Sequence, residues 1–157
     1  MNMIKKHGIL IVLILVVAGL LIALVFKNKI YDYIGSEVSK SASEETQFVA
    51  KEYIRKHFNY LDNNEDFEFT LLEFKSSGCT ICKQMEPVLE AIKNWDATKV
   101  NVQVIQILNP DSQELMKYFG IAAVPTHIIL DKQGTEVFRK YGFVSKEEFK
   151  NIIQLKI

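Results

Sequence analysis

An uninterrupted apolar run near the N-terminus constrains the fold of this chain more than any other feature of its sequence. Residues Gly8–Phe26 read GILIVLILVVAGLLIALVF and contain no charged side chain. A helix of this length spans about 28 Å, close to the roughly 30 Å hydrocarbon core of a bilayer. A helix buried in a soluble protein is seldom so uniformly apolar. The run therefore predicts one N-terminal transmembrane helix over residues 8–26, preceded by a short basic N-terminus at residues 1–7.

The residues after the apolar run bear on whether it is removed. A cleaved signal peptide usually has a shorter apolar core and ends in a small-x-small site. Here Ala23-Leu24-Val25-Phe26 leads straight into Lys27, and no cysteine directly follows that could carry a lipid. We therefore expect an uncleaved signal anchor, with a cleaved signal peptide as the alternative.

The lysines on the two sides of the run barely separate the two membrane orientations by the positive-inside rule. We expect an inside N-terminus, since an anchor on a small C-terminal domain makes most sense if that domain is exported. The predicted location is the cell membrane, single-pass, with the domain on the exported side.

The remainder of the chain divides into a polar linker and one domain. Residues 27–45 are polar with a serine-rich end, which is typical of a tether. Residues 46–157 are long enough for a single domain. Lysine plus arginine and aspartate plus glutamate both total 19, so the formal net charge is zero. The chain has no basic run, which argues against nucleic acid as a partner.

The domain alternates helical and strand patterns. Apolar residues between positions 50 and 61 follow one helix face. Residues 67–74 and 100–107 are rich in aromatic or aliphatic side chains and contain no glycine or proline, which predicts two buried strands. Residues 126–130 and 136–141 predict a hairpin, and a capping box at Ser145 opens a last helix. The pattern indicates an α/β protein, a central mixed sheet with helices on both faces.

Both cysteines lie at one junction in this pattern, within the stretch GCTICK. Cys79 lies just after the first predicted strand, and Cys82 lies in the first turn of the helix that the apolar spacing of residues 85–95 predicts. Free backbone N–H groups and the helix dipole favour negative charge there, so a thiolate at Cys79 would be stabilised. A thiolate is the nucleophile in disulfide exchange, and a C-x-x-C at a strand-to-helix junction is typical of redox chemistry.

Several spaced motifs make the domain resemble the thioredoxin family. They are LLEF-KSSG-CTIC-KQMEP, FGIAAVPT and IILDKQGTEVFRKYGFVS. The resemblance implies a thioredoxin-like three-layer α/β/α fold. It also implies a thiol–disulfide oxidoreductase in which Cys79 attacks a substrate disulfide, Cys82 resolves the mixed disulfide, and the two form a redox-active disulfide with no other cofactor. Its expected partners are protein thiols and disulfides, and a membrane electron donor or acceptor.

The resemblance assigns roles to two further sites. Val124-Pro125-Thr126 matches the family's cis-proline motif, whose backbone binds an extended substrate. Glu73 lies six residues before Cys79, where thioredoxins usually have a buried aspartate and some membrane-tethered relatives have glutamate. A carboxyl buried there can accept the proton of the resolving thiol, which favours a reductant. A solvated carboxylate at a strand end is the alternative for Glu73.

The chain also departs from the family's pattern. Gly78 and the pair between the cysteines replace an aromatic residue and a central proline, and Lys75 stands at a position where tryptophan is common. These changes put the redox potential and the substrate surface in doubt. His57 and His127 are expected to have structural roles.

Two alternatives to the oxidoreductase stay open from the sequence. The cysteine pair is also compatible with a thiol-based soft-metal carrier. No fourth ligand has a known position, so no metal site is predicted. The domain is also compatible with a non-catalytic interaction module that keeps only the fold.

Overall fold

The computed structural model describes residues 2–156, and side chains from residue 8 onward. The helices and strands follow in the order α1 (Asn2–Ser41), α2 (Glu44–Phe58), α3 (Tyr60–Asn63), β1 (Phe69–Lys75), α4 (Thr80–Lys93), β2 (Val100–Gln106), a 3₁₀ turn η1 (Pro110–Ser112), α5 (Gln113–Phe119), β3 (Thr126–Leu130), β4 (Glu136–Tyr141) and α6 (Lys146–Gln154).

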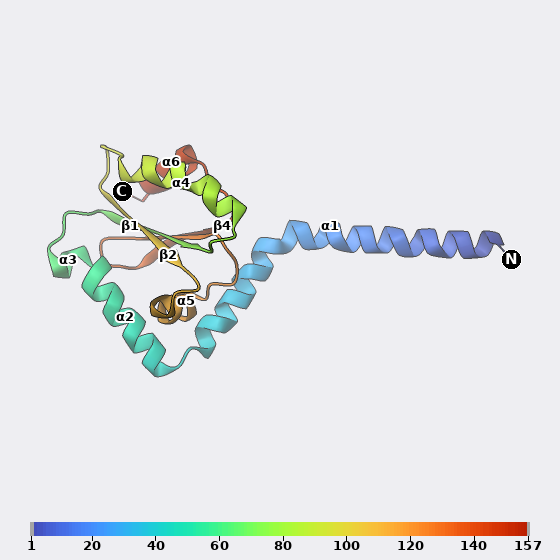
Figure 1. Cartoon of the computed structure of the whole chain (residues 1–157), viewed down its shortest axis with the longest axis horizontal. Helices are drawn as coiled ribbons and strands as arrows, with labels where there is room; N and C mark the ends of the chain where they lie inside the picture. The colour runs from blue at the N-terminus through green and yellow to red at the C-terminus, as the bar shows by residue number, and fades with distance from the viewer. Residues whose placement is uncertain (1, 157) are drawn as a thin grey trace.

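The four strands form one mixed sheet in the order β2-β1-β3-β4. β1 and β2 are parallel, whereas β3 is antiparallel to both β1 and β4. Helices α4 and α6 cover one face, and α2 and α5 cover the other (Figure 1). This arrangement confirms the predicted three-layer α/β/α fold with a central mixed sheet.

The alternation of side chains along β1 builds a separate core on each face of the sheet. Leu71 packs with residues of α4 and α6, whereas Leu72 and Phe74 pack with residues of α2 and α5. The same alternation holds in β3, where Ile129 joins the first core and Ile128 the second. Residues two apart along a strand therefore share a helix layer.

The second predicted strand is less buried than its apolar sequence indicates. β2 lies at an edge of the sheet, and only Val100 in it is buried. Val104 is 48% exposed. The expectation of a buried strand was wrong because a second strand to flank β2 is absent from the described residues 2–156.

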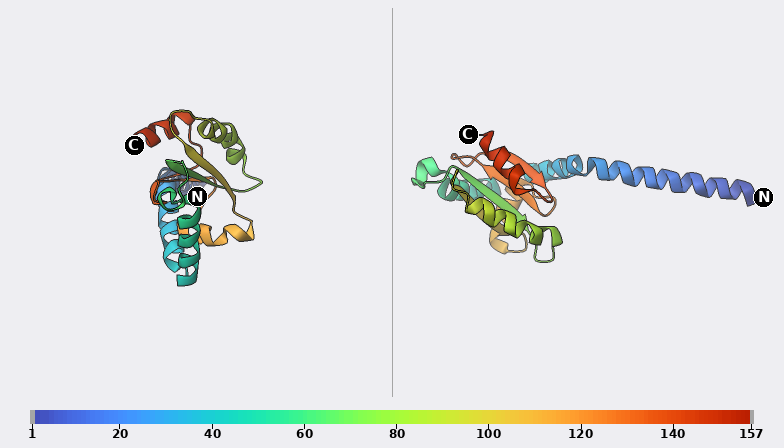
Figure 2. Two further views of the ribbon diagram at one scale, coloured as in Figure 1. Left: turned by 90° about the vertical axis from the view of Figure 1, so that its left-hand side faces the viewer. Right: turned by 90° about the horizontal axis from the view of Figure 1, so that it is seen from above.

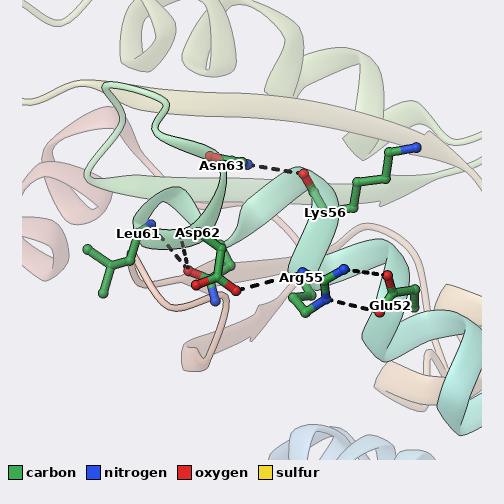
Figure 3. Close-up of polar contacts among 7 residues, drawn as sticks. Glu52, Arg55, Lys56, Leu61, Asp62 and Asn63 are labelled. Atoms are coloured by element: carbon green, nitrogen blue, oxygen red, sulfur yellow. Dashed lines mark hydrogen bonds and ion pairs between the residues drawn. The ribbon is translucent and has the colours of Figure 1, made fainter.

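The first helix of the domain is also interrupted where the pattern predicts continuity. Asn59 ends α2, and its side-chain oxygen accepts from the backbone N–H groups of Leu61 and Asp62, which starts α3 (Figure 3). Asn63 donates to a carbonyl of α2, and Arg55 lies 3.9 Å from Asp62. Leu61 consequently turns away from the core and is 63% exposed.

Helix α1 contains the apolar run and extends from the domain as a long rod (Figure 1). It is long and apolar enough to cross a membrane from Gly8 onward, and the apolar window has no buried residue. The large side chains of the run are therefore uncovered by protein. This is the arrangement expected of a membrane anchor, and a signal sequence has the same length and composition.

The predicted polar linker is not a loose tether. Residues 27–41 continue α1, which bends where it meets the domain (Figure 1). Tyr141 Oη donates to Asp32 at 2.9 Å, and Ser39 Oγ donates to the carbonyl of Tyr118 at 2.7 Å. Gly35 is buried against Gly120, where a Cβ on either residue would overlap the other's carbonyl oxygen. These contacts dock the end of α1 on the domain.

The docked helix meets one particular end of the sheet. Thr126 at the start of β3 pairs with Phe74 near the end of β1 and with Tyr141 at the end of β4. Tyr141 also stacks against Tyr31 of α1, with ring centroids 5.3 Å apart. Seen from above, α1 extends from the side of the domain where β1 ends and α4 begins (Figure 2).

Candidate functional site

The two cysteines form a disulfide at the start of α4. Their Cα atoms are 5.2 Å apart. Cys79 is the N-cap residue of α4 and is partly exposed, whereas Cys82 lies in the first turn and is fully buried. One sulfur is thus accessible to another molecule, and its partner is held behind it.

The start of α4 also favours negative charge on the Cys79 sulfur. Cys79 has an extended backbone conformation, and its Sγ accepts from the backbone N–H of Cys82 at 3.1 Å. The N–H groups of the first helical turn have no partner within the helix. They and the helix dipole therefore stabilise a thiolate at Cys79 once the disulfide is reduced.

The Val124–Pro125 motif lies beside the end of β1. The peptide bond between the two residues is cis. Pro125 is buried, and its carbonyl accepts from Gly142 N–H at 2.9 Å. Thr126 Oγ1 donates to the carbonyl of Ala123 at 2.6 Å. The motif is therefore fixed by its own hydrogen bonds on the sheet end that also carries the disulfide.

Glu73 is fully buried, which decides between the two expectations for this carboxyl. It lies two residues after Leu71 along β1 and therefore on the face covered by α4. Neither carboxylate oxygen has a hydrogen-bond partner among the described residues. Lys75 does not compensate it, because the Lys75 ammonium lies 3.0 Å from the carboxylate of Glu86.

His127 is a second buried ionisable residue at this site, and the sequence did not predict that it faces Glu73. It is the register partner of Glu73, and its Nε2 lies 3.8 Å from Glu73 Oε1. Both ring nitrogens of His127 lack hydrogen-bond partners. Its place directly after the Val124-Pro125-Thr126 motif was the available signal. His57, by contrast, is exposed on α2.

Two apolar side chains are exposed near the disulfide. Ile81, between the cysteines, is 42% exposed, and Phe143, directly after Gly142, is 50% exposed. Among the side chains that the structure describes, residues 8–156, no group of three His, Cys, Asp or Glu is arranged to hold a metal ion.

Comparison with known proteins identifies the family. The family model described as a thioredoxin-like domain matches residues 41–156, so the chain belongs to the thioredoxin-like family. Its fold and C-x-x-C disulfide are, at a general level, those of a thiol–disulfide oxidoreductase.

The relatives and solved structures described below each match about half or somewhat more of this chain. The chain is 35% identical to thioredoxin of Alicyclobacillus acidocaldarius over 78 residues, which are 50% of this chain and 71% of the relative. It is 25% identical over 87 residues, 55% of this chain, to the chloroplastic thioredoxin-like protein HCF164 of rice, Oryza sativa, of which it spans 33%. A mutant thioredoxin from Halobacterium salinarum superposes with a TM-score of 0.51 at 26% identity, covering 60% of this chain and 79% of that one.

Proposed function

We propose that this protein is a membrane-anchored thiol–disulfide oxidoreductase that reduces disulfides in protein substrates. The observation that carries the proposal is the unequal placement of the two cysteines. Cys79 is partly exposed at a helix N-terminus, which suits a nucleophile, and Cys82 is buried behind it, which suits a resolving thiol. The redox-active group is the Cys79–Cys82 pair, and the proposed reaction needs no further cofactor.

The reductive reaction proceeds in two exchanges. The Cys79 thiolate attacks a substrate disulfide, which forms a mixed disulfide and releases one substrate sulfur as a thiolate that takes a proton from water. The Cys82 thiol then loses its proton to Glu73, and its sulfur attacks Cys79 Sγ. The Cys79–Cys82 bond forms, the mixed disulfide breaks, and the second substrate sulfur leaves. Two electrons pass to the substrate.

Substrate binding is assigned to the motif Val124-Pro125-Thr126. An extended substrate segment pairs with backbone beside the cis peptide bond in the manner of an added strand. Ile81 and Phe143 supply exposed apolar contact near it. These surroundings suit an unfolded or extended protein segment better than a small thiol.

The anchor gives the redox site a defined position relative to the bilayer. We assign residues 8–26 to the membrane. Tyr31 contacts the sheet end that carries the disulfide and follows Phe26 by five residues, about 7.5 Å along a helix. The redox site would then lie close to the membrane surface. A membrane protein with its own thiol pair is accordingly the proposed electron donor, with the domain on the exported side.

The experiment measures disulfide exchange between the full-length protein in detergent micelles and a disulfide-bonded protein substrate. Cys79→Ser is expected to abolish exchange, and Cys82→Ser is expected to accumulate a mixed disulfide through Cys79. Persistent turnover by Cys79→Ser would refute its role as the nucleophile. If the unaltered protein exchanges no disulfide, titration of its reduced cysteines with Cu(I) separates a soft-metal carrier from a non-catalytic scaffold.

A further inference from the structure

Two buried ionisable side chains face each other on the side of the sheet covered by α4, the helix that begins at the redox disulfide. Glu73 of β1 and His127 of β3 are register partners, both have no accessible surface, and their nearest atoms are 3.8 Å apart. No hydrogen bond is available to either group from the rest of the described chain. Buried polar groups nearly always have hydrogen-bond partners, whereas the one ionic contact of each of these two among the described residues is with the other.

The charged groups on the Glu73 side are paired with each other or exposed to solvent. Lys75, on the same face of β1, pairs with Glu86 of α4. Glu90 and Lys93 of α4 carry opposite charges and are exposed, and the β2 register partner of Glu73 is apolar. None of these groups supplies a free positive charge to Glu73.

The charged group on the His127 side is likewise paired. Its register partner on β4 is Lys140, and the Lys140 ammonium pairs with Glu148 of α6. The remaining neighbour from α6 is Phe149, whose ring centroid lies 5.5 Å from that of His127. The neighbouring ion pairs compensate themselves, which leaves His127 as the basic side chain that contacts Glu73.

Burial makes this contact necessary for a carboxylate. An isolated carboxylate in an apolar interior is strongly disfavoured and takes up a proton instead, and then it cannot act as a base. An imidazolium about 4 Å away offsets that penalty. We propose that His127 is a positioning residue that keeps Glu73 ionised, so that Glu73 can accept the proton of the Cys82 thiol.

The inference rests on the proposed exchange function and explains one proton step within it. The Cys82 S–H bond breaks, its proton moves to a Glu73 carboxylate oxygen, and the electron pair stays on sulfur for attack on Cys79. Glu73 lines a groove of about 190 Å³ between α4 and β2, together with Lys75, Leu89 and Val102 among others, but both of its carboxylate oxygens are buried.

The test measures how fast a mixed disulfide is resolved in the full-length protein. The set is the unaltered protein, Glu73→Gln, His127→Gln and the double variant, each in detergent micelles between about pH 5.5 and 8.5. Each single variant should slow resolution at least about tenfold near neutral pH, a modest loss for general base catalysis. The double variant should be no slower than Glu73→Gln, because both changes remove the same base.

The control variant alters a histidine outside the site. His57→Gln changes an exposed histidine on α2 and should leave the rate and its pH dependence unchanged. Multiplied losses in the double variant, or a His127→Gln profile like that of the unaltered protein, would overturn the inference. Failure of the unaltered protein to exchange disulfides would instead refute the proposed function.

A second measurement leaves His127 in place and so does not depend on the folding of its variants. Ring ¹⁵N signals at pH 7 should show His127 protonated on both nitrogens in the unaltered protein and on one nitrogen in Glu73→Gln. A neutral His127 ring beside an intact Glu73 would contradict the proposed role.

Discussion

Adding one methyl group at Gly35 should release the end of α1 from the domain. In a free helix, Gly→Ala is stabilising by about 0.5–1 kcal/mol, because alanine restricts the unfolded backbone. In this protein the new Cβ would overlap the carbonyl oxygen of Gly120. That atom belongs to the backbone of the turn after α5, so it cannot move aside as a flexible side chain would. A substitution that favours the helix therefore opposes its docking.

The size of the effect follows from the contacts that docking makes. They are the hydrogen bond from Ser39 to the carbonyl of Tyr118, the bond from Tyr141 to Asp32, and the tilted ring pair of Tyr31 and Tyr141. Each hydrogen bond is worth about 1 kcal/mol net, and an aromatic pair about as much. The docked state is then favoured by about 3 kcal/mol, or roughly 150-fold.

Hydrogen–deuterium exchange of residues 27–41 in the full chain measures this population directly. Gly35→Ala should raise amide exchange there and at Tyr118–Ile121, with little change in the sheet. Gly19→Ala is the matched control, since it lies in the same helix and nothing lies within 4 Å of its added Cβ. Unchanged exchange in Gly35→Ala would refute the docking, as would equal changes in both variants.

Two further predictions concern the domain itself. Leu71→Ala removes a fully buried side chain and should lower the free energy of unfolding by about 2–5 kcal/mol in urea titrations. Leu155→Ala, at a site that is 84% exposed, should change it by less than about 0.5 kcal/mol. Equal effects of the two substitutions would contradict the assigned core. Burial raises the pKa of the Tyr60 phenol, against the opposing hydrogen bonds of Thr70 and Asn101. Folding thus favours the protonated phenol, which contributes stability below about pH 10 that is lost as the pH rises through the folded value. Tyr60→Phe should make the decline in unfolding free energy above pH 10 shallower, and an unchanged slope would contradict this reasoning.

Local sequence patterns predicted most of the fold because periodicity and capping act over a few residues. The hairpin of β3 and β4 and the start of α6 lie where turn residues and the capping box put them. The exposure of β2 could not be predicted, because an apolar run is the same in a central strand and an edge strand. The docking of residues 27–41 depends on a close approach of Gly35 to Gly120, 85 positions away, which no local pattern encodes.

The same difference between local and long-range features applies to the candidate site. The positions of Cys79 and Cys82 follow from a short motif at a strand-to-helix junction, and the burial of Glu73 follows from its apolar neighbours. The pairing of Glu73 with His127 is a matter of strand register, 54 residues apart in sequence. The sequence alone assigned His127 only a structural role, because its pairing with Glu73 depends on the register between β1 and β3.

The reduction potential of the Cys79–Cys82 pair tests the proposed function most directly. The full-length protein is equilibrated in dithiothreitol buffers of graded ratio, and its free thiols are then quantified by alkylation. We predict a single two-electron transition at about −270 mV or below, the range of thioredoxin. A transition near about −120 mV would reverse the direction of electron flow to that of an oxidant, and a pair that does not exchange would contradict the redox function itself.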